Sequence, residues 1–227
     1  MLSYLGIRRA VGVVGLSLPI LLGPTGWVVY GLDIQENMSG YYHTPMRDVF
    51  VGVMCTIGIF LFCYRGVNRA EQWTGYLSCT SAFVIALCPI DANTDPLNQQ
   101  TVSGHLHTVA GGTFFVMLAV YSLIHFPRPM STVVSNDESH HTEVDRMARN
   151  VVYYVSGLTI LASLGAMGTH FFLLPEELNA RLDRYSFTFW MEWIAVWAFS
   201  AAWLTKGRAI VADIAEPLAK LQQIVLR

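Results

Sequence analysis

The sequence is poor in charged residues. Only 13% of its 227 residues are Asp, Glu, Lys or Arg, whereas 53% are hydrophobic, and the mean hydropathy is +0.43. Soluble domains typically carry about 25% charged residues. This composition excludes an ordinary soluble globular domain and indicates an integral membrane protein.

Several motifs are also absent. The chain has four cysteines but no CxxC pair, and we predict three of them to be packing residues, with Cys88 as the possible exception. The sequence contains no Gly-rich phosphate loop, no internal repeat and no basic patch. Nothing in it therefore predicts a nucleic-acid partner.

Long apolar runs recur along the chain instead. A helix of about 20 residues crosses about 30 Å of hydrocarbon, and six runs have this length. They are residues 10–31, 46–64, 72–90, 104–126, 150–173 and 186–205. The first run is too long for a cleavable signal peptide and lacks a convincing cleavage site. We therefore predict an all-α bundle of six transmembrane helices.

The basic residues predict the orientation of this bundle, since short cytoplasmic loops carry an excess of Lys and Arg. Of the 14 basic residues, all but Arg47, Arg181 and Arg184 fall on one side. Both termini are therefore predicted to be cytoplasmic. We expect residues 1–208 to form the transmembrane domain, and residues 209–227 to form a tail that is either an amphipathic helix on the inner membrane surface or an ordinary cytoplasmic helix.

Polar residues collect at one predicted depth, near the extracytoplasmic ends of the helices. The set comprises Ser39, His43, Asp48, Asp91, Asn93, Asp95, His105, His107, His170 and Glu192. Four loops or helix ends thus converge on one layer, which predicts a polar pocket there.

Some members of this layer have simple structural explanations. Thr44 and Pro45 resemble a helix start, and Asp48 would then complement the helix dipole in the first turn. That role and a ligand or base role for Asp48 are equally plausible from the sequence. The polar residues of 91–95 are typical of a turn after Pro89.

The histidines and Glu192 are harder to explain structurally. His105 and His107 lie about 200° apart around a helix, so only one of them can face the bundle. We expect this to be His107, because the small residues Ala110 and Gly111 lie on its face of the helix and allow close packing. Glu192 is an acid within an apolar run, which indicates either a functional residue or a carboxylate paired with His107, His170 or Arg47 to lock the bundle.

Two functions fit this layer. In the first, His43, His107 and His170 bind zinc together with Asp48 or Glu192, the remaining carboxylate acts as general base, and zinc-bound water cleaves a lipid amide or ester. In the second, the layer is a structural or lipid-headgroup site in a non-enzymatic accessory or regulatory membrane subunit. A bis-histidine haem b between His107 and His170 is a weaker third option.

Three runs carry a resemblance to known proteins: SGYYHTPMRDVFVGVMCTIGIFLFCYRG, LHTVAGGTFFVMLAVYSLIHF and WMEWIAVWAFSAAWLTKG. They resemble a family of uncharacterised bacterial six-helix membrane proteins, over nearly the whole chain. The resemblance implies a multi-pass protein of the bacterial inner membrane. That family often has Tyr and Asn where this chain has His43 and Asp48.

Two more distant likenesses concern function. The chain is similar to the DRAM and Sfk type of six-helix proteins, which implies a lipid-related or regulatory role with membrane lipids, partner subunits or a second copy as partners. It also resembles the CREST membrane hydrolases, whose zinc site uses a Ser-x-x-x-His element, an Asp and two further His. Ser39-x-x-x-His43 and Asp48 match the first part of this set, which makes Ser39 a candidate catalytic residue, but the late His-x-x-x-His pair of those enzymes is absent.

Overall fold

The computed structural model describes residues 4–64, 66–92, 97–127 and 139–207. Within these ranges, residues 4–5 and 139–146 are described by their backbone alone. The predicted tail over 209–227 and the residues Asn93 and Asp95 lie outside these ranges. The described residues form helices and connecting loops and contain no strand. The elements are α1 (Tyr4–Tyr30), η1 (Met38–His43), α2 (Arg47–Cys63), α3 (Arg69–Leu87), α4 (Val102–Val120), η2 (Tyr121–His125), α5 (Ser139–Phe172), α6 (Glu176–Asp183) and α7 (Phe187–Lys206).

Each of the six predicted apolar runs is a helix, so the all-α prediction is confirmed. The boundaries differ most at α1 and α5, which begin earlier than predicted. Residues 4–9, with Arg8 and Arg9, extend α1, and a mostly polar stretch from Ser139 extends α5. α5 has 34 residues, which corresponds to about 51 Å at the helical rise.

Three of these helices are long and apolar enough to cross a membrane. They are the segments Gly6–Tyr30, Val102–His125 and Met147–Phe172. Many large apolar side chains on the outside of the bundle are exposed, among them Trp27, Phe62 and Val109. An all-helical membrane protein accounts for both observations, because lipid covers such side chains.

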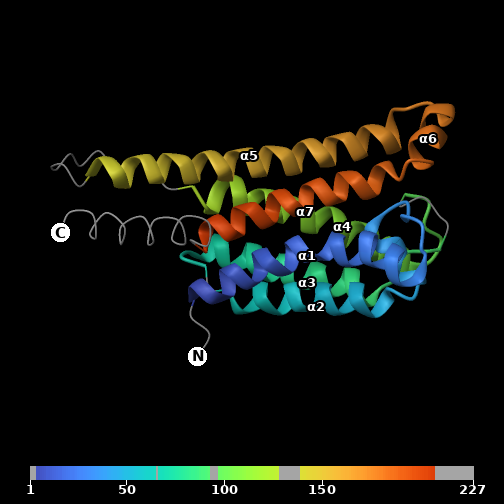
Figure 1. The fold of residues 1–227 in the computed structure, drawn as a ribbon, viewed down its shortest axis with the longest axis horizontal. Helices are drawn as coiled ribbons and strands as arrows, with labels where there is room; N and C mark the ends of the chain where they lie inside the picture. The colour runs from blue at the N-terminus through green and yellow to red at the C-terminus, as the bar shows by residue number, and fades with distance from the viewer. Residues whose placement is uncertain (1–3, 65, 93–96, 128–138, 208–227) are drawn as a thin grey trace.

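The six long helices pack in a ring that follows the order of the chain. α1 packs on α2, α2 on α3, α3 on α4, α4 on α5 and α5 on α7, and α7 closes the ring against α1. The short helix α6 lies beyond the end of α5 and contacts α7 (Figure 1). The ring surrounds a core of apolar side chains contributed by all six helices.

The two ends of the bundle differ in what they contain. The start of α1 and the end of α7 lie at the same end (Figure 1), where Arg9 Nε donates to the carbonyl oxygen of Gly207 at 3.0 Å. The opposite end holds the 31–46 segment with η1, residues 88–92 and 97–101, and α6. This second end is where the predicted polar layer lies.

The predicted start of α2 is wrong by two residues at its cap. The helix begins at Arg47 and its N-cap is Met46, which makes no side-chain capping bond, instead of Thr44. The Thr44 hydroxyl accepts a hydrogen bond from Met46 N at 3.1 Å in the preceding turn, and the exposed Asp48 lies in the first helical turn, as predicted. Asp48 is therefore placed to stabilise the helix dipole.

Candidate functional site

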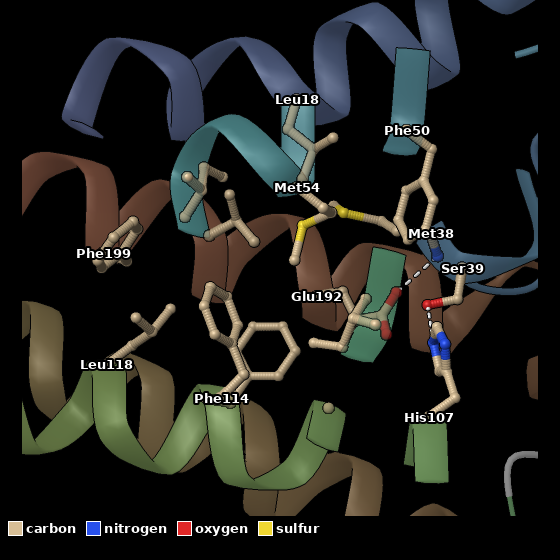
Figure 2. Close-up of a pocket in the computed structure, with 15 residues that line it drawn as sticks. Leu18, Met38, Ser39, Phe50, Met54, His107, Phe114, Leu118, Glu192 and Phe199 are labelled. Atoms are coloured by element: carbon tan, nitrogen blue, oxygen red, sulfur yellow. Dashed lines mark hydrogen bonds between the residues drawn. The ribbon is translucent and has the colours of Figure 1, made fainter. Parts of the chain in front are cut away.

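Two adjoining cavities open between the helices at this second end. The inner one has a volume of about 50 Å³ and is lined by apolar side chains from α1, α2, α4 and α7. The outer one has a volume of about 260 Å³ and lies between α4, α5 and α7. Ser39, His107 and Glu192 line both cavities, and Figure 2 shows them around the inner one. The structure thus brings together three of the residues that the sequence singled out.

Ser39 and His107 form a hydrogen-bonded pair. Ser39 Oγ lies 2.7 Å from His107 Nε2, and His107 Nδ1 lies 2.7 Å from the carbonyl oxygen of Cys88. A carbonyl oxygen can only accept, so Nδ1 carries the proton of the neutral ring. Nε2 is then the acceptor, and the Ser39 hydroxyl donates to it.

The orientation of His107 within α4 agrees with the sequence prediction. Its side chain is buried, at 4% exposure, whereas His105 is exposed. The 200° separation around the helix places the two rings on opposite faces.

The short helix η1 holds Ser39 in place. The Asn37 side chain accepts from Gly40 N at 2.8 Å and caps the helix. Met38 N donates to Glu192 Oε2 at 2.6 Å, and Phe189 N donates to the carbonyl oxygen of Glu36 at 2.9 Å. Two of these three bonds come from α7, so the position of Ser39 depends on the packing of η1 against that helix.

Glu192 projects from the second turn of α7 into the same space as the Ser39–His107 pair (Figure 2). Oε2 is bonded to Met38 N, and Oε1 accepts no hydrogen bond from any described residue. The carboxylate also forms no ion pair within the described part of the chain. A lock with His107, His170 or Arg47 is therefore not what the structure contains.

His43 and Asp48 lie outside this pocket. His43 Nε2 is 2.7 Å from the carbonyl oxygen of Ile90, which ties η1 to the residues that follow α3. Neither residue lines either cavity. Their role in the structure is to hold the loop and to start α2.

His170 is engaged elsewhere. Its Nε2 lies 2.9 Å from Asp183 Oδ1, and its Nδ1 is buried without a partner in the described residues. This pair joins the end of α5 to α6, and nothing in the sequence indicated it, because an acid 13 residues away in a polar loop has no distinctive pattern.

The predicted zinc ligands do not converge on one point. No group of three or more His, Cys, Asp or Glu side chains within the described ranges is arranged to hold a metal ion. His43, His107 and His170 each have a different protein partner, so they do not fit a shared zinc site in this arrangement. Both ring nitrogens of His107 are engaged, so haem ligation does not fit it either.

Asp91 is a structural residue. Its carboxylate accepts from Gln100 N at 2.6 Å, from Thr101 N at 2.9 Å and from the Thr101 hydroxyl, while Thr101 caps α4 by accepting from Gly104 N at 3.0 Å. The bond from the Thr101 hydroxyl, followed by those from the two amides, lowers the pKa of the Asp91 carboxyl below its ordinary value. The turn predicted after Pro89 is present here.

One contact of the Ser39–His107 pair was not predicted from the sequence. Cys88 was singled out as a thiol, but its carbonyl oxygen is the atom that contacts His107. Sequence reasoning has no signal for a backbone oxygen, because every residue carries one.

Comparison of this chain with protein-family models, curated proteins and solved structures found no match.

Proposed function

We propose that this chain is a multi-pass protein of a bacterial cytoplasmic membrane that cleaves carboxylic esters or amides of a lipid in a pocket at the extracytoplasmic side. All six long helices would span the membrane, with both termini in the cytoplasm. The single observation that supports the activity is the chain of contacts from Ser39 Oγ through His107 to the carbonyl oxygen of Cys88.

This arrangement has the parts of a serine nucleophile with its base. A serine hydroxyl is a weak nucleophile until a neighbouring base accepts its proton. His107 Nε2 is an acceptor 2.7 Å from that hydroxyl, and the Cys88 carbonyl holds the tautomer in which Nε2 is free of a proton. A third group that orients the base is a recurrent feature of such sites.

The reaction can be written with these residues alone. Ser39 Oγ forms a bond to the carbonyl carbon of the lipid while His107 Nε2 takes the hydroxyl proton. The bond to the leaving alcohol or amine then breaks, and His107 returns the proton to that group. Water, deprotonated by His107, then attacks the acyl-serine, and the acid leaves as Ser39 recovers its proton.

The shape of the pocket favours a lipid. The outer cavity of about 260 Å³ is walled mainly by apolar side chains, including Phe115, Leu164 and Met167. An acyl chain could lie along this wall with its carbonyl group near Ser39, since apolar walls with a few polar groups are typical of ligand sites.

The test uses purified protein and a fluorophosphonate carrying an alkyl chain, which loses fluoride when a serine attacks its phosphorus. We expect a phosphonyl adduct on Ser39, detected by mass spectrometry, and none in Ser39→Ala. His107→Gln should slow labelling by about 10²-fold or more, since general bases contribute about 10²–10⁴.

Ser103→Ala is the matched control. Ser103 lies at the same end of the bundle, but its hydroxyl donates to the carbonyl oxygen of Pro89 at 3.0 Å and it lines neither cavity. This variant should label at the wild-type rate. Absence of an adduct on Ser39, together with no hydrolysis of nitrophenyl esters of fatty acids, would sink the proposal and favour a non-enzymatic lipid-binding role.

Zinc stays a prediction from the sequence. Metal analysis of the purified protein separates the two mechanisms: stoichiometric zinc that is lost in His43→Ala and His170→Ala would favour a metal-dependent hydrolase over the Ser39–His107 pair.

A further inference from the structure

Glu192 is the only side chain with a formal charge among the described residues that line either cavity. No Lys, Arg or Asp side chain lines them within the same ranges. Its Oε2 has one backbone donor, at 2.6 Å, and its Oε1 faces the cavity without a donor from the described residues. The pocket therefore presents an acceptor that the protein itself does not satisfy.

Arg47, which the sequence offered as a partner of Glu192, is directed elsewhere. Arg47 Nη2 donates to the Tyr42 hydroxyl at 2.9 Å, and its guanidinium lies 4.5 Å from the centre of that ring. Arg47 is exposed and lines neither cavity. It does not compensate the charge of Glu192.

An acid held among apolar side chains is costly unless a cation or several donors compensate it. One amide N–H is not enough for an ionised carboxylate, which has about four lone-pair sites. Removing such a group from water without a partner costs several kcal/mol, whereas a well-placed cation restores that loss. A ligand can supply the missing partner.

We infer that the pocket recognises a protonated amine, which donates to Glu192 Oε1 while the apolar part of the same molecule lies in the cavity between α4, α5 and α7. The inference deepens the proposed function and rests on its pocket, but not on turnover by Ser39. If Ser39 acts as proposed, the substrate carries both an ammonium group and an acyl group.

Two sources could supply this chemistry: an amino lipid of the membrane, or a soluble amine that enters from the extracytoplasmic side. The size and apolar walls of the outer cavity favour the amino lipid. Probes without an ester or amide bond test recognition alone, because they cannot be turned over.

The experiment measures binding of dodecylammonium and of the neutral dodecanol to the full chain in phosphatidylcholine nanodiscs, with empty nanodiscs subtracted. We expect the wild type to bind dodecylammonium at least about tenfold more tightly, since a hydrogen bond to a charged group is worth about that factor. Glu192→Gln should bring the two affinities together by weakening dodecylammonium alone. Its amide oxygen can still accept from Met38 N.

Glu36→Gln is the matched control. Glu36 is an exposed acid at the same end of the bundle and lines neither cavity, so this variant should keep the wild-type preference. If Glu192→Gln does not fold, Glu192→Asp keeps the charge on a shorter arm and should show an intermediate preference.

Ethanolamine distinguishes the two sources. If ethanolamine displaces dodecylammonium from the wild type but not from Glu192→Gln, the site binds a protonated amine that is soluble. If ethanolamine does not displace it, the site binds the protonated amine of a lipid. Equal binding of the two long-chain probes by the wild type, or an unchanged preference in Glu192→Gln, would overturn the inference. A preserved preference without any serine labelling would contradict the hydrolase and leave the amine site standing.

Discussion

His107 is held at both ring nitrogens, by Ser39 on one side and by the Cys88 carbonyl on the other. Each bond has a length of 2.7 Å, and the ring is almost fully buried. Its rotamer and tautomer are therefore determined before any ligand binds. Preorganisation of this kind is what a general base requires.

Asp91 gives a prediction about pH. Its hydrogen bonds lower the pKa of the carboxyl below the ordinary value of 3.8, so the folded state favours the ionised form. The resulting stability is complete above about pH 4 and is lost as the pH falls through the lowered pKa. Asp91→Asn should therefore lower the melting temperature at pH 7 and reduce its dependence on pH in the acid range.

The measurement is the melting temperature in detergent between pH 3 and pH 7. Asp33→Asn is the control, because Asp33 is exposed and its side chain makes no hydrogen bond with any residue of the described ranges. Equal melting curves for the wild type and Asp91→Asn across this range would contradict the assignment.

At the scale of the element, α1 illustrates how close approach depends on small residues. Gly12 and Gly15 face α7, and a Cβ at Gly12 would lie 2.7 Å from Leu204 Cγ and 3.0 Å from Leu204 N. Close helix contacts through small residues are typical of membrane bundles.

α1 also contains Pro24, which has no backbone N–H to donate to the carbonyl oxygen of Ile20. The Thr25 hydroxyl donates to that oxygen instead, at 3.2 Å.

Gly12→Ala should therefore force α1 away from α7. Overpacking of this kind costs about 1–3 kcal/mol, and the melting temperature in detergent should fall accordingly. Gly52→Ala in α2 is the matched control, because a Cβ there meets nothing within 4 Å, and it should show no loss. Equal stability of the two variants would show that the contact between α1 and α7 is looser than the structure indicates.

At the scale of the whole molecule, the ring of six long helices brings the start of α1 and the end of α7 to one end. The pocket lies at the other end, between η1 and the starts of α4 and α7. With six spans, the pocket would face one side of the membrane and both termini the other.

This topology predicts the accessibility of single cysteines in a variant without the four native ones. Asp33→Cys and Leu178→Cys should react with an impermeant maleimide in intact spheroplasts, because both positions are exposed at the pocket end. Val67→Cys, which is 83% exposed at the opposite end, should react only after permeabilisation. Labelling of Val67→Cys from outside, or of Asp33→Cys and Leu178→Cys from different sides, would contradict six spans with cytoplasmic termini.

The sequence by itself determined the helices and their environment. Runs of apolar residues are local and can be read along the chain, so four of the six helices were predicted within three residues of their observed starts, whereas α1 and α5 begin 6 and 11 residues earlier than predicted. The polar layer was also predictable, because depth follows from the position of a residue along its helix. The burial of His107 rather than His105 followed from helical periodicity.

Only the tertiary structure decided which members of that layer meet. Ser39 contacts a histidine 68 residues away, and Glu192 accepts from an amide 154 residues away, while His43 and His170 have partners elsewhere. Such pairings depend on how each helix is rotated in the ring and on the path of η1, which the packing of α7 against the 31–46 segment determines. Residue type and depth alone could not separate a shared metal site from a serine–histidine pair.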